Sequence, residues 1–465
     1  MGAFLSDAQF GDSIEEFNWA HGLEWGYWKH PPLTTWLMIA YQKLMGFDYK
    51  NAYAVAFLCL VATLFFYYRL ARLLLVNRSS SLIAVLLLSS SFFFTWRSQI
   101  LNHNVTLTMM SSVMAWLFFY IFSRKEIKVW HWIFLGLMAA LTFLAKYQAV
   151  IIFLSLFLCL FFYRRKFLTP KVYLGLTLAG IVFLLALMPH VNWILHAHSY
   201  IVDYTLNRFE HSPSLLERTS SAVSFLLQQV RFYLIPLALT VLCTFKKNNL
   251  RFSALRKPLK KITDLPWLKG LLFTPILFSF LLSLITGMKL MNHWGMAIFL
   301  FLPLALAALI QEASGSNIKI TLRRYVVLQL LSLSIFALSR MNQHGAESTK
   351  RDDLSFPAKA IAFEVLQSWT EKTQCPLKFI SGPAFEAGIV SVYSGSNAVV
   401  LENGSFDRSP WVNREDFERR GAVLISKELP SNMNSNYLHL NNGLVNQFPQ
   451  LKSFYWTLIL PAAKC

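Results

Sequence analysis

The sequence predicts a helical membrane protein, a polytopic all-α bundle of about ten transmembrane helices followed by a small α/β domain. Of its 465 residues, 55% are hydrophobic and only 14% are charged, which is too apolar for an ordinary soluble enzyme. Apolar runs recur between residues 52 and 338, and runs of about 20 residues match the thickness of a bilayer core. Beyond residue 341 the charges balance, and short apolar runs alternate with amphipathic helical patterns.

Residues 1–51 form the first predicted unit, a loop with amphipathic helical character ahead of the first span. Its Pro31-Pro32 pair ends one helix and begins another, because proline suits the first turn of a helix and disfavours helix in the residue before it. The following helix, Leu33–Gly46, is too short to span a bilayer, and we expect it to lie along the membrane interface.

Residues 52–340 form the second predicted unit, the transmembrane bundle. Its apolar runs vary from about 13 to about 24 residues, against the roughly 20 that a helix needs to cross a bilayer. In chain order the predicted spans are Ala52–Leu75, Ser81–Trp96, Val105–Phe122, Trp132–Leu144, Ala149–Phe162, Tyr173–Leu195, Val223–Thr244, Leu268–Thr286, Trp294–Ile310 and Tyr325–Leu338.

The net charge of +19 would suit a nucleic-acid-binding protein, but its distribution excludes that class. Every second loop is basic, and these five loops together hold 21 Lys and Arg against 3 acids. They are Arg69–Arg78, Ser123–Val129, Tyr163–Val172, Phe245–Lys269 and Gln311–Arg324. The loops between them hold 5 Lys and Arg, and the tail from residue 341 holds 12 charges of each sign. Such alternation is typical of a membrane protein with its basic loops in the cytoplasm, so we predict no nucleic-acid partner.

Residues 341–465 form the third predicted unit, a soluble α/β domain. Amphipathic helix patterns cover Pro357–Lys372 and Asn413–Arg420. Short apolar runs typical of buried strands are Leu377–Ile380, Ala398–Leu401, Ala422–Ile425 and Tyr455–Leu460. The charge alternation places this domain, the first 51 residues and the weakly basic loops together on the extracytoplasmic side.

Carboxylates are scarce ahead of the tail, and no predicted span contains Asp or Glu. The densest cluster on the predicted extracytoplasmic side is Asp12, Glu15 and Glu16. A reaction that needs a carboxylate base at this membrane face therefore has few candidates. From the residues alone, Asp12 could equally be a helix cap or a solvated loop acid.

The segment from Asp12 to Trp36 resembles the first extracytoplasmic loop of the GT-C type membrane glycosyltransferases of the family-39-like group. This group includes bacterial relatives of the protein mannosyltransferases and the lipid A aminoarabinose transferase, which take a sugar from a polyprenyl-phosphate carrier. The family pattern is an acidic pair, spaced aromatics, a Gly-Tyr and a Lys/His-Pro-Pro-Leu. Here Gly26-Tyr27 and His30-Pro31-Pro32-Leu33 match it. The second acid of the pair falls on Ser13, so Glu15 or Glu16 would have to replace it.

This resemblance covers the chain from about residue 12 to about residue 428 and implies a role for each candidate side chain. Asp12 would be the catalytic base that takes the proton of the acceptor, with Glu15 and Glu16 beside it. Family members carry a first transmembrane helix ahead of this loop, and no apolar span precedes residue 12 here. We therefore expect either a start further upstream or a short N-terminus that crosses the membrane unaided.

Two lysine motifs in other loops also match family positions. Lys146-Tyr147 follows the span Trp132–Leu144, and Lys289 begins a Lys-x-x-x-x-Trp pattern that ends at Trp294. The resemblance implies that Lys146, Tyr147 and Lys289 bind the donor phosphate with assistance from His30, since lysine is a compact phosphate-binding charge. The alternative is that each lysine only extends its ammonium from a span end toward water.

Arg97–Asn104 is a polar insertion between two predicted spans, and its Asn102-His103-Asn104 resembles a bacterial subgroup of the family. The resemblance implies that these three residues, Arg97 and Trp294 bind the sugar or the acceptor. The alternative is a polar loop that caps the next helix. No cofactor is required by the pattern, and a divalent metal is left open, with His30, His103 and His293 as candidate ligands beside the acids.

The sequence thus predicts an inverting hexosyl- or pentosyltransferase at the outer face of a bacterial inner membrane. Its partners would be a polyprenyl-phosphate sugar, a lipid A, other glycan or protein acceptor, and membrane lipids. The rival reading is a transporter or flippase of polyprenyl-linked glycans, which should carry polar residues deep within its spans, and these are sparse here. A receptor-like membrane protein is the second rival, and it leaves the clustered acids and lysines unexplained.

Overall fold

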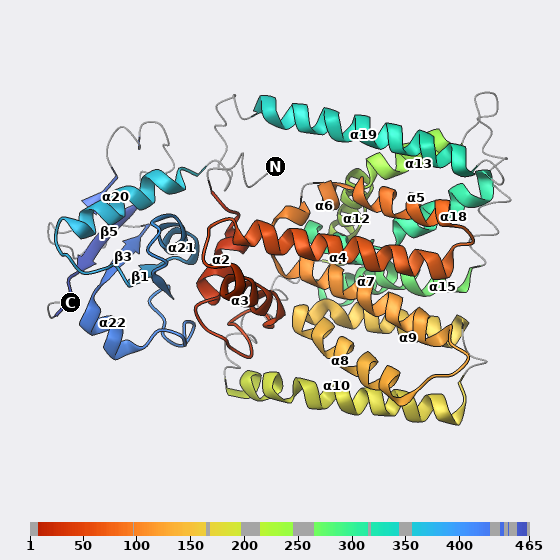
Figure 1. Ribbon diagram of the computed structural model, residues 1–465, viewed down its shortest axis with the longest axis horizontal. Coiled ribbons are helices and arrows are strands. Elements are labelled where there is room, and N and C mark those ends of the chain that lie inside the picture. Colours follow the sequence, from red (N-terminus) through yellow and green to blue (C-terminus); the bar gives the residue numbers. More distant parts are fainter. Residues whose placement is uncertain are drawn as a thin grey trace.

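The structure is a computed structural model that describes residues 8–95, 97–163, 168–196, 214–244, 265–314, 318–343, 356–427, 438–440, 445 and 453–462. Figure 1 shows a helical bundle and a separate α/β domain along one long axis, with α2 and α3 between them. The predicted fold class is therefore confirmed, whereas the limits of its three units, 1–51, 52–340 and 341–465, stay a prediction.

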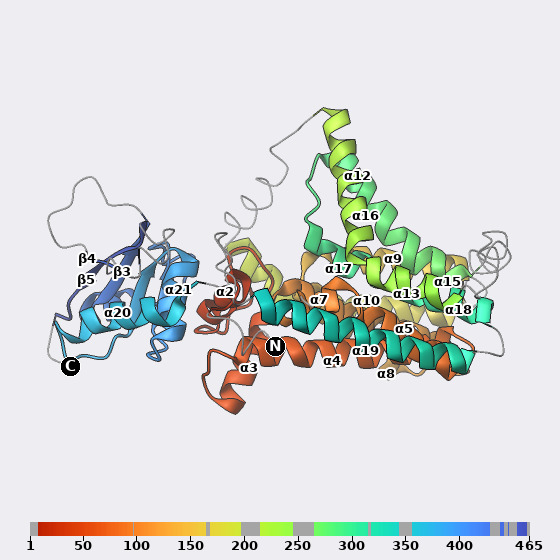
Figure 2. The ribbon, with the colours of Figure 1, turned by 90° about the horizontal axis from the view of Figure 1, so that it is seen from above.

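The first segment and the bundle are mainly helical, and every predicted span falls on one to three helices. The helices are α2 (Gly11–Trp19), α3 (Leu33–Met45), α4 (Asn51–Leu74), α5 (Arg78–Ser89), α6 (Phe92–Thr95), η1 (Arg97–Gln99), α7 (His103–Phe122), α8 (Val129–Ala145), η2 (Tyr147–Ala149), α9 (Val150–Tyr163), α10 (Pro170–His196), α12 (Leu215–Phe232), α13 (Leu234–Thr244), α15 (Pro266–Leu268), η4 (Lys269–Phe273), α16 (Thr274–Thr286), η5 (Asn292–Trp294), α17 (Gly295–Ile298), α18 (Leu302–Ser314) and α19 (Ile318–Gln343). Figure 2 shows α12 and α16 side by side on one flank of the bundle.

The number of membrane spans differs from the predicted ten. Among the described residues, four helices are long and apolar enough to cross a membrane, or up to seven if each bent pair counts as one span. The helices α12 and α13 meet at a bend of 54°, as do the helical segments 292–298 and 302–314. Helices α8 and α9 have 17 and 14 residues, fewer than the roughly 20 that a straight span requires.

One predicted span, Ser81–Trp96, is broken for a local chemical reason. The hydroxyls of Ser89, Ser90 and Ser91 donate to the carbonyls of Leu86, Leu87 and Leu88. Such back-bonding competes with continuation of the helix. Helix α5 accordingly ends at Ser89, and α6 begins at Phe92.

The C-terminal domain is a five-stranded mixed sheet with helices, in the strand order β2-β1-β3-β5-β4. Strand β1 is parallel to both β2 and β3, and β5 is antiparallel to β3 and β4. Its elements are α20 (Ala358–Thr370), β1 (Phe379–Gly382), α21 (Ala384–Tyr393), β2 (Val399–Glu402), α22 (Arg414–Arg420), β3 (Ala422–Ser426), β4 (Leu438–His439) and β5 (Tyr455–Ile459). The four predicted strands coincide with β1, β2, β3 and β5, whereas β4 and α21 were not predicted.

The domain contacts the first segment through a close approach of α21 to α2. A Cβ atom at Gly388 in α21 would overlap Ile14 Cγ2 and would lie 2.6 Å from Asn18 Oδ1. Asn18 also donates from Nδ2 to the carbonyl of Ala384 over 2.9 Å. Only a glycine lets the two helices approach this closely, so position 388 holds the C-terminal domain against the segment that carries Asp12.

We expect Gly388→Ala to lower the free energy of unfolding by about 1–3 kcal/mol, because the added methyl group overpacks this interface. The thermal unfolding temperature of the full chain in nanodiscs would measure the effect. Gly180→Ala in α10 is the matched control, since a Cβ there meets nothing within 4 Å. Equal unfolding temperatures for the two variants would show that α2 and α21 do not pack as described.

Candidate active site

A cavity of about 520 Å³ opens at the end of the bundle that faces the C-terminal domain. Ten of the twelve candidate residues line it: Asp12, Glu15, Glu16, His30, Asn102, His103, Asn104, Lys146, Tyr147 and Trp294. They come from α2, the turn before α3, the start of α7, the α8–η2 turn and η5. The chain thus brings together groups that are up to 282 positions apart, from residue 12 to residue 294.

The acids of the cavity share one face of α2. Asp12, Glu15 and Glu16 are spaced at i, i+3 and i+4, which places them on adjacent turns of one helix face. Asp12 is exposed and sits in the first turn, where the helix dipole favours a negative charge. An accessible carboxylate facing a cavity is suited to accept a proton from a bound group.

Asn102 orients this carboxylate while it caps α7. Its Nδ2 donates to Asp12 Oδ2 over 3.0 Å. Its Oδ1 accepts from the backbone N–H groups of Asn104 and Val105 at 3.0 and 3.2 Å. Asn102 is therefore a helix cap that also contacts Asp12, and its role in binding the sugar or the acceptor stays a prediction.

Glu16 and His103 form a buried pair behind the exposed acid, with their side chains 1% and 4% exposed. His103 Nδ1 lies 3.1 Å from Glu16 Oε1, and His103 Nε2 lies 3.0 Å from the carbonyl of Pro31. Since a carbonyl only accepts, Nε2 must donate, and one further proton must lie between Nδ1 and the carboxyl. Thr35 donates to the other Glu16 oxygen over 2.7 Å. The network fixes the His103 ring, against which His30 packs with ring centroids 4.2 Å apart.

Glu15 pairs with a residue that the sequence analysis missed, Lys29. The Lys29 ammonium lies 2.6 Å from Glu15 Oε1 and also lines the cavity. Burial raises the pKa of Glu15 to about 7, although Lys29 acts in the opposite direction. The available signal was the position of Lys29 directly before His30 in the loop motif, beside a cluster of acids.

Lys146 brings a second ammonium to the cavity, from the position directly after α8. Its Nζ donates to Asn104 Oδ1 over 2.6 Å and lies 5.5 Å from the centroid of the Trp294 ring. The hydroxyl of the neighbouring Tyr147 lies 3.2 Å from His190 Nε2. These contacts aim a cation at the same space as the α2 acids.

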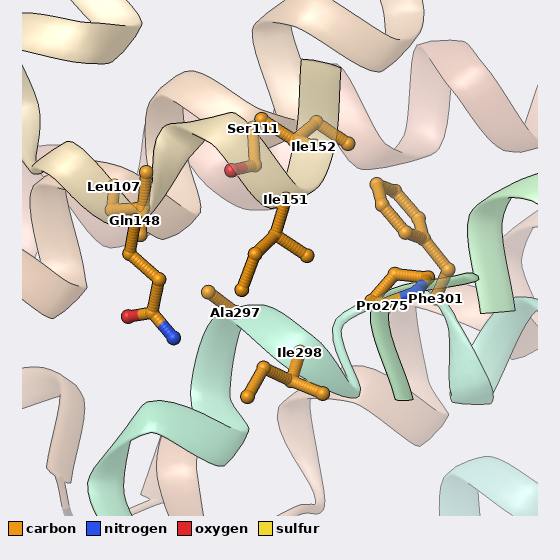
Figure 3. Close-up of a pocket in the computed structure, with 9 residues that line it drawn as sticks. All are labelled: Leu107, Ser111, Gln148, Ile151, Ile152, Pro275, Ala297, Ile298 and Phe301. Carbon is orange, nitrogen blue, oxygen red and sulfur yellow. The ribbon is translucent and has the colours of Figure 1, made fainter. Parts of the chain in front are cut away.

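The rest of the cavity lining is mainly apolar. Its apolar part includes Val150 and Ile151 of α9, Phe278 and Leu282 of α16, and Leu290, whereas Gln148, Ser279 and His293 add polar groups. A smaller cavity of about 20 Å³ adjoins, since Gln148 and Ile151 line both. Figure 3 shows it enclosed mainly by aliphatic and aromatic side chains. The site is therefore polar at the α2 end and mainly apolar toward the bundle.

Two candidate residues, Arg97 and Lys289, are not among those that line the cavity. Arg97 lies in η1. Lys289 is exposed, whereas its neighbours Met288 and Leu290 do line the cavity. Their roles stay predictions.

The structure holds few candidates for a metal site. Among the described residues, no group of three or more His, Cys, Asp or Glu side chains is arranged to hold a metal ion. The nearest arrangement is Glu16 with His103, and that pair is already satisfied by Thr35 and Pro31. Binding of a divalent metal ion at this site therefore stays an open question.

The bundle, the acid-bearing first segment and the small sheet domain together define the fold of the GT-C type membrane glycosyltransferases, as the resemblance predicted. The family model of the dolichyl-phosphate-mannose-protein mannosyltransferases matches residues 29–193. Among solved structures, the chain is similar to ArnT from Cupriavidus metallidurans in the apo state, with a TM-score of 0.61 and 12% identity over 98% of this chain and 95% of that one. It is also similar to the same protein bound to undecaprenyl phosphate, with a TM-score of 0.60 and 11% identity over 100% and 96% of the two chains. No curated protein sequence matches the chain.

Proposed function

We propose that the protein is an inverting glycosyltransferase that moves a sugar from a polyprenyl-phosphate carrier to an envelope acceptor. The observation that carries this proposal is a single cavity with an accessible carboxylate and two ammonium groups at one end and apolar walls at the other. A sugar phosphate joined to a long hydrocarbon chain requires this combination. The undecaprenyl phosphate bound in the similar ArnT structure supports the carrier.

The chemistry follows from the polar end of the cavity. The acceptor hydroxyl attacks the anomeric carbon, its proton passes to Asp12, and the bond from that carbon to the phosphate oxygen breaks. The departing polyprenyl phosphate gains negative charge, which Lys29 and Lys146 stabilise from fixed positions. Asn102 keeps the Asp12 carboxylate aimed at the acceptor. One displacement of this kind inverts the anomeric centre.

The other candidate residues take supporting roles in this proposal. His30, held against His103, and Tyr147 assist at the phosphate, and Trp294 offers an aromatic face to the sugar. Asn104 fixes Lys146. Lys289 and Arg97 would act on the donor or acceptor from outside the lining described above. The acceptor is lipid A, another glycan or a protein hydroxyl.

The outer face of a bacterial inner membrane is the proposed location. Helix α4 starts beside α3 and runs to the end of the bundle away from the C-terminal domain (Figure 1). The basic residues Arg72, Arg78 and Arg124 follow or end helices that run in this direction. Because basic loops favour the cytoplasm, this arrangement supports the proposal that the cavity and the C-terminal domain lie on the opposite side.

The donor KM is expected to rise with pH through the range in which Glu15 ionises. Below a pH of about 7 Glu15 is protonated and Lys29 is released to the phosphate, whereas above it the ion pair holds Lys29 back. The sugar-phosphate donor is a phosphodiester, so its own charge does not change between about pH 6 and 8. Glu15→Gln should flatten this dependence in initial-rate measurements. If Glu15→Gln kept the wild-type pH dependence of the donor KM, Glu15 would not control the release of Lys29.

A panel of undecaprenyl-phosphate sugars presented to the purified protein in nanodiscs tests the proposed function. Wild type should release undecaprenyl phosphate from at least one of these donors and should not use nucleotide sugars. Parallel samples with a chelator would show whether the reaction requires a divalent metal ion. Movement of a lipid-linked glycan across proteoliposomes with no donor consumed would favour the transporter instead.

A further inference from the structure

Glu402 is a buried carboxylate of the C-terminal domain that the reaction described above does not use. It ends strand β2 and is 1% exposed. Its Oε1 accepts from Asn18 Nδ2 over 3.2 Å, and its Oε2 accepts from Trp28 Nε1 over 3.1 Å. Both donors belong to the first segment, so the carboxylate joins the domain to α2 and to the turn before α3.

Joining two parts of a chain through a buried acid costs free energy, because burial opposes the charged form. Burial does raise the pKa of Glu402, against the side-chain donors around it and the nearby Lys29 charge. An apolar contact would hold the domain without this penalty. The carboxylate instead provides direction, since each of its oxygens fixes one N–H group of the loop.

The contacts of Trp28 lead from Glu402 to the cavity. The Lys29 ammonium lies 5.0 Å from the centroid of the Trp28 ring, and the Arg408 guanidinium of the C-terminal domain lies 4.9 Å from it. Cations over an indole face are attracted to it. The domain thus holds Trp28 by its N–H group and by its ring, and Trp28 in turn lies against the lysine that lines the cavity.

We propose that Glu402 is a positioning residue that fixes Trp28 and, through it, the Lys29 ammonium, so that the C-terminal domain completes the donor-phosphate site. This inference rests on the proposed function. It gives the domain a part in catalysis that does not require any of its residues to touch the substrate. The packing of α21 on α2 at Gly388 holds the domain in the required place.

The test uses the full chain in nanodiscs with the best undecaprenyl-phosphate sugar donor. Glu402→Gln keeps the volume of the side chain but replaces one accepting oxygen with a donor. Trp28→Phe keeps a smaller aromatic face and removes the N–H group. We expect each to raise the donor KM about tenfold with a smaller change in kcat, and we expect the effect to vanish in a Lys29→Met background because coupled residues are not additive.

Asp416→Asn is the matched control within the same domain. Asp416 pairs with Lys378, Arg419 and Arg420 on the domain surface, so its loss should lower the unfolding temperature and leave the donor KM unchanged. A purely structural role for Glu402 would give that same pattern, or an effect of equal size with and without Lys29. Either result would overturn the inference.

A readout without donor separates this inference from the proposed function. The rate of lysine acetylation, followed by mass spectrometry, should rise at Lys29 in Glu402→Gln and stay constant at the exposed Lys43. If wild type consumes no donor but Lys29 labelling rises, the proposed function fails and the positioning contact stands. If wild type consumes donor while neither KM nor labelling changes, the positioning role is wrong.

Discussion

Asp12→Asn is expected to reduce sugar transfer by about 10²- to 10⁴-fold, the usual loss when a positioned general base is removed. The amide has almost the shape of the carboxylate and can still accept from Asn102, but it cannot take the acceptor proton. The loss should therefore appear in kcat, with the donor KM nearly unchanged. Initial rates of undecaprenyl phosphate release would show this loss. They should be compared for wild type and Asp12→Asn after the two proteins have been shown to unfold at the same temperature.

Asp48→Asn is the control for this prediction. Asp48 belongs to the same first segment and does not line the cavity. Its carboxylate accepts a local bond from the Lys50 N–H group over 2.7 Å. It should keep full activity. Near-normal turnover by folded Asp12→Asn would instead move the base to Glu15 or Glu16.

Lys146→Met is expected to lower kcat/KM by about 10²- to 10³-fold, as removal of one preorganised charge-stabilising group does elsewhere. Its ammonium is aimed into the cavity by Asn104 and Trp294, where the leaving phosphate gains charge. Lys146→Arg should recover part of the loss, because the charge returns with a different shape.

The exposed Lys43 of α3 provides the comparison for this lysine. Lys43→Met removes an equal charge from a residue outside the cavity lining and should leave kcat/KM unchanged. Equal activities of Lys146→Met and Lys43→Met would mean that Lys146 serves only as an interfacial charge at the end of α8.

The helices and most of the strands could be predicted because each depends on neighbours in the chain. The apolar run Val105–Phe122 became α7 almost unchanged, and Ala422–Ile425 became the central strand β3. The break after Ser89 could not be read from hydrophobicity, since it depends on hydroxyl bonds to the preceding turn. The span predicted as continuous at Val223–Thr244 bends between α12 and α13, just ahead of Pro236. Proline has no N–H group to donate to the carbonyl four residues earlier, at Phe232, and a hydropathy pattern does not register this loss.

The candidate site was predictable where a motif fixed the register and not where distant segments meet. The acids of α2 and the Asn102-His103-Asn104 insertion both line the cavity. Glu402 and Trp28 are in contact although they lie 374 positions apart in the chain. No local sequence pattern predicts such a contact. Lys289 illustrates the opposite case, because spacing to Trp294 does not determine which side chains of a non-helical segment point inward.

The configuration of the transferred sugar, together with the amount of polyprenyl phosphate released, tests the central claim most directly. Nuclear magnetic resonance of the product formed by wild type in nanodiscs would give the anomeric configuration, and mass spectrometry would give the stoichiometry. A single displacement assisted by Asp12 predicts an inverted anomeric centre and one polyprenyl phosphate for each sugar transferred. Retention of configuration, or a donor left intact by the folded protein, would contradict it.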